Sequence, residues 1–493
     1  MRNLSKMLAG ASAAIAAASV LGLAGTAQAQ TGAAALATPK ATVAAGVETA
    51  VGLTLPLSCT GPVGVTGFPA PNGTNTNLKV AQRATASHPV VKLVGMWPPP
   101  SSDPQTFALS ITCNNGKTGS ENVVDESSPV VADFSGTGSD TIESVMDQFS
   151  ADWNAKHSTG KLWSFDALNP ICGSSCQGDT IVTKHTSTDR TTCSQPRPFG
   201  SGAGISALEN TKSLGTTPCL DYARSSSGRA TTDPTTISYI TLAGDAVTVA
   251  TQPGTHAPLS LLTTGVLQGI YNCTITKWNQ IPGNSAGSGD TIIPMLPQSA
   301  SGTRKFFLVT ALGLPNTASS CVSTSATRQG AAGNADNTLE ENEGVDPSLN
   351  MNTADVIFPF SVGKWIAQTF HSASCGTNAQ CFANESGCTP TATTNLFGCN
   401  LHGTMVLDSI NGTKPTTGSG SKTTINPLFT PTFTRPLFEV VNATEGTIPA
   451  NLAPLFGPTG FTCTNATAKT DLKNYGFLVL PAGTAAGDCG HAG

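Results

Sequence analysis

The sequence predicts an α/β protein with a β-rich extension in front of its main domain. From about residue 129 onward, strand-like segments alternate with helix-like segments, which is the pattern of an α/β domain. Within residues 30–128, the segments Val47–Leu57 and Thr106–Thr112 instead alternate apolar and polar residues, as strands do. We therefore expect a β-rich extension over residues 30–128 and an α/β domain over residues 129–493.

The composition limits the kinds of partner that this chain can have. Only 11% of its 493 residues are charged, against about 25% in a typical globular chain. The 25 basic and 30 acidic residues give a net charge of −5. A general nucleic-acid binder would carry a basic patch, so we expect no nucleic-acid partner. If the protein binds an anion, local hydrogen-bond geometry has to hold it.

The first residues have the features of an export signal. Arg2 and Lys6 precede the uncharged stretch Met7–Gly25, and Ala27-Gln28-Ala29 follows the small-x-small cleavage pattern. We predict a signal peptide over residues 1–29 that is cleaved after Ala29. The protein would then be secreted or extracytoplasmic, in a periplasm or at a cell surface. An uncleaved anchor helix is the alternative.

The 14 cysteines are consistent with export, because an exported chain meets an oxidising compartment. Proximity in the chain suggests the pairs Cys59–Cys113, Cys172–Cys176, Cys193–Cys219, Cys273–Cys321 and Cys463–Cys489. Metal binding by Cys172 and Cys176, or by the four cysteines between Cys375 and Cys399, is the alternative. Only the spacing of Cys172 and Cys176 comes close to that of a zinc site, and no histidine completes the pattern, so we expect disulfides and no metal.

A glycine-rich loop precedes the first expected helix of the α/β domain. We predict a strand over Val130–Phe134, a loop over Ser135–Thr141, and then a helix with apolar residues at helical spacing. Asp140 is the expected N-cap, and Glu143 would complete a capping box. Such a strand, loop and capped helix together present free backbone N–H groups to an anion.

Three further loops are also rich in small and hydroxyl-bearing residues, and two of them add an arginine. Gly200–Gly204 opens a second helical stretch, and Asp221–Ser227 places Arg224 beside three serines. Gln298–Arg304 follows a strand over Thr291–Leu296 and enters a helix. A guanidinium matches a tetrahedral oxyanion bidentately, and serine and threonine hydroxyls donate to its remaining lone pairs.

The four segments GTGSDTIESVM, GSGAGI, LDYARSSS and QSASGTRKFF resemble the ligand loops of PstS-type phosphate-binding proteins of ABC importers. Glu341–Gly344 followed by Phe358–Ser361 is similar to a later segment of the same family. The resemblance covers residues 129–493. It implies a two-lobed, type II periplasmic-binding-protein-like fold. Lobe I would comprise residues 129–245 and 400–493, and lobe II residues 246–399.

The resemblance implies that phosphate or a similar tetrahedral oxyanion binds between the lobes. The implied ligand-binding residues are Ser139, Asp140, Thr141, Ser201, Ser225, Ser301, Gly302 and Thr303. Two positions depart from the family: Ser226, which we also expect to bind the ligand, replaces an acidic residue, and Pro297 replaces an arginine. We expect Arg224 and Arg304 to supply the missing charge and to contact the ligand. Asp140 is the nearest candidate to accept the proton of a protonated oxyanion.

The prediction is therefore an exported, monomeric solute-binding protein for ABC-type import, with a membrane permease as its partner. We expect no catalytic residues, no metal and no cofactor. A secreted hydrolase or phosphoryl-transfer enzyme is one alternative, but the sequence lacks the clustered carboxylate and histidine metal ligands that it would need. Gly283–Gly287 matches the G-x-S-x-G pattern, which we attribute to chance. No clear strand precedes that serine, as a nucleophile elbow requires. A cell-surface binding or scavenging protein is the other alternative.

Overall fold

The computed structural model describes residues 128–167, 178–324, 339–342, 344, 354–371 and 402–493, together with Gly116 and seven strands nearer the N-terminus. The chain divides into Met1–Ala34 and Ala35–Gly493. The predicted signal peptide lies outside the described residues. Within the part that is described, no helix is both long enough and apolar enough to cross a bilayer.

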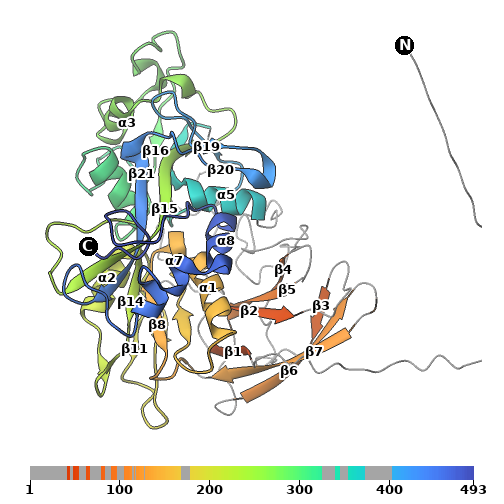
Figure 1. Ribbon diagram of the computed structural model, residues 1–493. Helices are drawn as coiled ribbons and strands as arrows, with labels where there is room; N and C mark the ends of the chain where they lie inside the picture. Colours follow the sequence, from red (N-terminus) through yellow and green to blue (C-terminus); the bar gives the residue numbers. More distant parts are fainter. Residues whose placement is uncertain are drawn as a thin grey trace, which may run out of the picture. The chain divides into compact units, whose positions relative to one another are not determined.

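The N-terminal strands form two small sheets (Figure 1). The first has the order β1-β7-β6-β3, with β1 at Ala41–Ala44, β7 at Thr118–Glu126, β6 at Gln105–Cys113 and β3 at Val63–Thr66. The second has the order β2-β5-β4, with β2 at Glu48–Thr54, β5 at Val90–Met96 and β4 at Lys79–Arg83. Strands β2 and β6 coincide with the two strands expected from apolar alternation.

The α/β part is built on one mixed sheet of eight strands. Its order is β16-β17-β15-β21-β14-β8-β9, and β18 pairs with β15 beside this path. The strands are β8 Phe134–Gly138, β9 Leu162–Ser164, β14 Tyr222–Ser225, β15 Ile237–Thr251, β16 Ile293–Pro294, β17 Val356–Ser361, β18 Val406–Leu407 and β21 Thr434–Asn442. Every residue of β15 is buried, which explains why its sequence is a nearly continuous run of small, apolar and β-branched residues.

Helices and short hairpins complete this part of the molecule. The α-helices are α1 Asp140–Asn154, α2 Ser201–Glu209, α3 Thr264–Tyr271, α4 Gly302–Lys305, α5 Val362–His371, α6 Ala453–Phe456, α7 Phe461–Thr464 and α8 Ala466–Asn474. The hairpins are β10 (Thr180–Val182) with β11 (Ser194–Pro196), β12 (Ser213–Leu214) with β13 (Thr217–Pro218), and β19 (Thr416–Thr417) with β20 (Thr424–Ile425).

Strand β15 connects two separate hydrophobic cores. Its first part, Ile237–Ala246, pairs with β21, and its last part, Val247–Thr251, pairs with β17. One core gathers around α1 and α8, and the other around α3 and the segment after α4. Figure 1 shows β15 and β21 running side by side between these two parts. Strand β15 therefore changes its pairing partner next to the predicted boundary between lobe I and lobe II. That boundary stays a prediction.

The second core extends further along the chain than the predicted lobe II. Ile410, Ile425, Phe429 and Phe433 pack in the same cluster as Trp278. The sequence assigns residues 400–433 to lobe I. Among the described residues, the chain returns to the first core with β21, which begins at Thr434. The predicted lobe boundary at residue 400 stays a prediction.

The first strand and its helix cap differ from the prediction. The strand is β8, Phe134–Gly138, and not Val130–Phe134. The N-cap of α1 is Ser139, whose hydroxyl accepts a hydrogen bond from the backbone N–H of Thr141 at 3.2 Å. Glu143 completes no capping box, because its carboxylate accepts the N–H of Ala167 at 2.6 Å.

Long-range packing explains why a glycine-rich segment forms this strand. The ring of Tyr222 occupies the space that a side chain at position 136 would need, so only glycine fits in β8 there. Asp133 holds the segment before the strand, since its carboxylate accepts hydrogen bonds from the N–H of Lys161 and from Trp163. None of these partners is close in sequence.

Three of the predicted disulfides are confirmed. Cys193–Cys219, Cys273–Cys321 and Cys463–Cys489 are bonded, with Cα–Cα separations of 5.3, 5.8 and 5.5 Å. The pairings that involve Cys59 and Cys172–Cys176 lie outside the described residues, as do the four cysteines between Cys375 and Cys399.

The carboxyl group of Glu439 makes stability depend on pH. Glu439 lies fully buried on β21, and neither carboxyl oxygen has a hydrogen-bond partner among the residues that the structure describes. Burial raises its pKa from 4.5 to about 8, partly offset by the charge of Arg224. Because the folded state then binds the proton that the unfolded state releases, stability is lost as the pH rises through this range.

We expect the free energy of unfolding to fall by roughly 3 kcal/mol between about pH 5 and about pH 8 through Glu439 alone. Glu439→Gln removes the titrating group, so it should flatten this decline whatever its effect on absolute stability. Urea unfolding at several pH values measures the slope. An equally steep decline in the variant would show that Glu439 is not its source.

Candidate ligand-binding site

Two of the predicted loops meet at Thr141 and Thr303. Thr141 lies in the first turn of α1, and Thr303 lies in the first turn of α4, which continues directly into a π-helical segment, Phe306–Ala311. The two hydroxyl oxygens are 3.3 Å apart, and both residues are buried. The first turns of two helices that are far apart in sequence therefore place their hydrogen-bond donors around one point.

A carboxylate of the protein itself occupies this point. One oxygen of Glu341 accepts a hydrogen bond from the Thr141 hydroxyl at 2.8 Å, and the other accepts the backbone N–H of Thr303 at 3.1 Å. The side chain of Glu341 is fully enclosed, with 1% of its surface exposed. Backbone N–H groups at helix starts and nearby hydroxyls favour negative charge. The two helix starts therefore hold an anionic group.

Arg435 of β21 brings a buried positive charge to the same place. Its Nη2 donates to the Thr303 hydroxyl at 3.1 Å and to Asp245 at 2.8 Å, and its Nη1 donates to the carbonyl of Ser226 at 2.7 Å. Its Nε donates to the same Asp245 oxygen at 3.0 Å. The guanidinium carbon lies 5.5 Å from the centre of the Phe306 ring. Arg435 thus joins three of the segments around the site.

Asp245 and Asn342 fix these groups in place. Asp245 lies in the middle of β15 and also accepts hydrogen bonds from the Ser361 hydroxyl at 2.9 Å and from the N–H of Gly363 at 3.1 Å. The Asn342 amide donates to Asp140 at 3.0 Å and to the Thr141 hydroxyl at 3.3 Å. Hydrogen bonds of this kind position the donors before any ligand arrives.

Asp140 is paired with a lysine on the facing helix. The ammonium group of Lys364, on α5, lies 3.5 Å from a carboxylate oxygen of Asp140 and donates to the Asp140 carbonyl at 3.1 Å. Burial acts to lower the pKa of Lys364, but the charges of Asp140 and Glu143 outweigh it and raise that pKa. Lys364 therefore stays charged next to the start of α1.

The second and third predicted loops also meet here. The hydroxyl of Ser201, at the start of α2, accepts the N–H of Ser226 at 3.1 Å, and the two hydroxyl oxygens are 3.3 Å apart. Gly302 packs directly against both serines, and a Cβ atom at this position would clash with both hydroxyls. Glycine is therefore required for α4 to approach α2 this closely.

Gly302→Ala is expected to push α4 away from Ser201 and Ser226. An overpacked contact of this kind costs about 1–3 kcal/mol, and it would displace the neighbouring N–H of Thr303. We expect lower thermal stability and weaker ligand binding, measured by thermal unfolding and calorimetry. Gly265→Ala is the matched control, because a Cβ atom there meets nothing. Equal thermal stability and equal ligand affinity of Gly302→Ala and Gly265→Ala would contradict this role of Gly302.

The two arginines predicted to contact the ligand have other contacts. Arg224 donates to the carbonyl of Ser139 at 3.0 Å and to the hydroxyl of Ser164 at 2.7 Å. Arg304 donates to the carbonyls of Pro297 and Asn316, both at 3.1 Å. These bonds tie each guanidinium to the loops around it. Ligand contact by Arg224 and Arg304 stays a prediction, and the described contacts indicate a supporting role.

The remaining predicted serines shape their own loops. The Ser139 hydroxyl caps α1, and the Ser301 hydroxyl caps α4 by accepting the N–H of Arg304 at 3.0 Å. The Ser225 hydroxyl donates to the carbonyl of Ser227 at 2.8 Å. The structure thus brings Thr141, Thr303, Ser201, Ser226 and Gly302 together, while Ser139, Ser225 and Ser301 act within their own turns.

Sequence reasoning missed the residues that supply most of the charge at this site. They are Asp245, Glu341, Lys364 and Arg435, and the neutral amide of Asn342 was missed with them. Glu341 and Asn342 lie in a segment already noted as similar to the family, and a lone aspartate in a long apolar strand signals a buried charge that needs a partner. The G-x-S-x-G match forms no nucleophile elbow, as expected, because Ser285 lies in a loop between a short 3₁₀-helix (Trp278–Gln280) and β16.

Comparison with known proteins places this architecture in a family. A search of curated proteins finds no match. Among solved structures, a 2,6-sialyltransferase of Photobacterium sp. JT-ISH-224 shares 13% identity over 28% of this chain and 27% of its own, with a TM-score of 0.09. So low a score supports no conclusion about fold or function. The model of the PBP superfamily domain matches residues 174–474, more than half of the chain. The chain therefore belongs to the PBP superfamily of periplasmic-binding-protein-like, solute-binding domains.

Proposed function

We propose that this solute-binding domain captures phosphate or a similar tetrahedral oxyanion at the meeting point of Thr141 and Thr303. The observation that carries the proposal is the carboxylate of Glu341, which accepts hydrogen bonds from both helix starts. A site that holds one buried anionic group in this way has the donors to hold another.

The bound oxyanion would take the place of the Glu341 carboxylate. The N–H of Thr303 and the hydroxyl of Thr141 would donate to two of its oxygens. Arginine has five N–H donors, and four hydrogen bonds of Arg435 are made to Asp245, Ser226 and Thr303. One Nη1 hydrogen has no partner among the described residues, so it is available for a third oxygen.

Binding, rather than bond making, is the activity that this arrangement supports. Closure of two lobes around a solute is a common transition of binding proteins, and β15 and β21 are the strands that cross between the two cores. The export signal predicted over residues 1–29 and the three disulfides support an extracytoplasmic protein. We propose that it is secreted and delivers its ligand to an ABC-type import permease.

A panel of anions tests this function. Phosphate, sulfate, arsenate and phosphate esters are each titrated by calorimetry and by thermal unfolding. A ligand present at 100 times its Kd should stabilise the folded state by about 2.7 kcal/mol. We expect such a shift with at least one inorganic oxyanion, and its loss in Thr141→Val, which removes the hydroxyl donor.

Thr470→Val is the matched control for the panel. This threonine lies on the exposed side of α8 and donates to the carbonyl of Ala466 at 2.9 Å, so the variant should bind as the wild type does. If no oxyanion stabilises the wild-type protein, the proposed function is wrong.

A further inference from the structure

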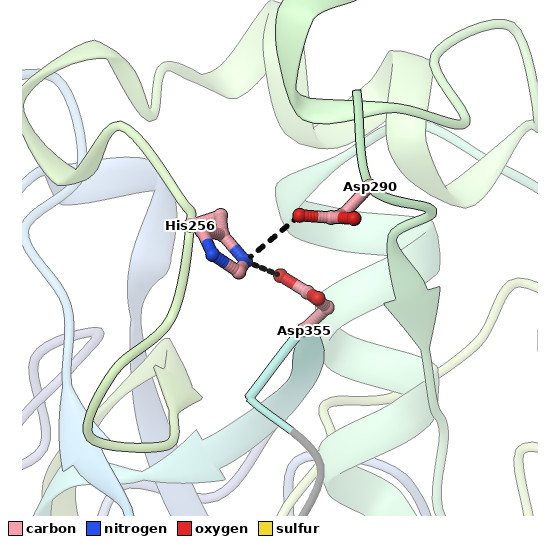
Figure 2. A group of neighbouring side chains, drawn as sticks. All are labelled: His256, Asp290 and Asp355. Carbon is pink, nitrogen blue, oxygen red and sulfur yellow. Dashed lines mark hydrogen bonds and ion pairs between the residues drawn. The ribbon is translucent and has the colours of Figure 1, made fainter. Parts of the chain in front are cut away.

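Three metal-ligating side chains converge at a second place in the molecule, which shares no residue with the ligand-binding site (Figure 2). His256 lies in the segment after β15, Asp290 lies before β16, and Asp355 lies just before β17. The Nδ1 of His256 is 3.2 Å from Asp290 and 3.1 Å from Asp355. One ligand atom from each residue lies within 4.8 Å of the other two.

We infer that His256, Asp290 and Asp355 form a binding site for a divalent transition-metal cation of the zinc class. An imidazole nitrogen with two carboxylate oxygens is a ligand set that zinc and related ions accept. Ligands about 2.0–2.1 Å from a zinc ion are roughly 3.0–3.4 Å from one another in tetrahedral or octahedral geometry. The two spacings from Nδ1 match this range, and three protein ligands leave positions for water.

Hydrogen bonds already orient both carboxylates. Asp355 accepts a hydrogen bond from the ring nitrogen of Trp278 at 2.6 Å, and this tryptophan is completely buried. The Asp290 carboxylate accepts a hydrogen bond from the hydroxyl of Ser288, which in turn accepts the N–H of Asp290. Partners that hold a ligand in one orientation typically accompany metal sites.

The charge and exposure of the cluster suit a cation from solvent. Within the described ranges, neither aspartate forms an ion pair with a lysine or an arginine. Even a protonated His256 would leave a net charge of −1 on the three groups, whereas a divalent cation would neutralise the two carboxylates. The side chains of His256 and Asp290 are 49% and 54% exposed, so the ion has access.

A bound cation would tie together three segments that lead into or out of neighbouring strands of the sheet. Strands β15, β17 and β16 are adjacent, and each of the three ligands lies close to the end of one of them or in the loop before it. We therefore expect zinc to stabilise this edge of the sheet without taking part in oxyanion binding.

Calorimetric titration with zinc chloride tests the inference on the full chain, produced without a histidine tag and treated with a chelator before dialysis. We expect saturable binding of a single zinc ion and a zinc-dependent rise in the unfolding temperature. His256→Ala and Asp290→Asn should each weaken zinc binding by about tenfold or more. Because Asp290 is half-exposed, its variant should fold, which far-ultraviolet circular dichroism checks.

His491→Ala is the control, because this histidine bonds to the carbonyl of Thr484 and lies outside the cluster. It should bind zinc as the wild type does. The inference is overturned if the wild type shows no saturable zinc binding, or if both cluster variants retain wild-type affinity. Oxyanion affinity should be unchanged in His256→Ala, so the metal site and the proposed function succeed or fail separately.

Discussion

Arg435→Met is expected to weaken oxyanion binding about a hundredfold, because losing one partner of a buried, hydrogen-bonded charge pair costs about 2–5 kcal/mol. Methionine keeps the length and apolar character of the side chain but removes every donor to Thr303 and Ser226. The same change leaves Asp245 buried without its cation, which should cost about 3–5 kcal/mol of stability. Calorimetry and urea unfolding measure the two effects.

A double variant separates binding from folding. Adding Asp245→Asn to Arg435→Met removes the uncompensated buried charge, so much of the lost stability should return while binding stays weak. Arg229→Met is the matched control, because Arg229 forms a partly exposed ion pair with Glu445 at 3.1 Å. Wild-type oxyanion affinity in the double variant would show that Arg435 does not contact the ligand.

Glu341→Ala is expected to tighten oxyanion binding by about tenfold or more, since like charges placed side by side cost several kcal/mol. In the proposed mode of binding, an oxyanion would have to displace the Glu341 carboxylate from Thr141 and Thr303 of the wild type. Alanine leaves both donors free. Glu341→Gln, which removes the charge but keeps an acceptor, should give an intermediate affinity in the same calorimetric titration.

Glu209→Ala is the control for general charge effects, because Glu209 ends helix α2 on an exposed surface. It should leave the affinity unchanged. Weaker binding by Glu341→Ala than by the wild type would contradict displacement and would instead give Glu341 a direct, favourable contact with the ligand.

The parts of the fold that follow from local pattern could be predicted from the sequence. Helices α1, α2 and α4 begin within a few residues of their expected positions, because small residues precede each of them and apolar residues follow at helical spacing. Strand β8 was misplaced because FSGTG has little intrinsic strand preference. Its strand conformation depends on pairing with β14 and β9, and the ring of Tyr222 packs against Gly136.

The candidate site likewise contains residues that a local pattern predicts and residues that only the fold brings together. Thr141 and Thr303 could be found because each lies at a helix start. The ion pair of Asp245 with Arg435 spans 190 residues, and only the pairing of β15 with β21 brings the two together. Arg224 and Ser225 show that a shared place in the sequence does not by itself give a shared place in a site. They are neighbours in sequence, but successive side chains on a strand point to opposite faces, and both lie on β14.

The most direct test of the central claim is anomalous diffraction from crystals grown with arsenate and, separately, with selenate. Both ions are tetrahedral oxyanions whose heavy atoms can be located. We predict an anomalous peak within hydrogen-bonding reach of the Thr303 N–H, the Thr141 hydroxyl and Arg435, with the Glu341 carboxylate displaced. The absence of a peak there with either ion, with Glu341 still bonded to Thr141 and Thr303, would contradict the account.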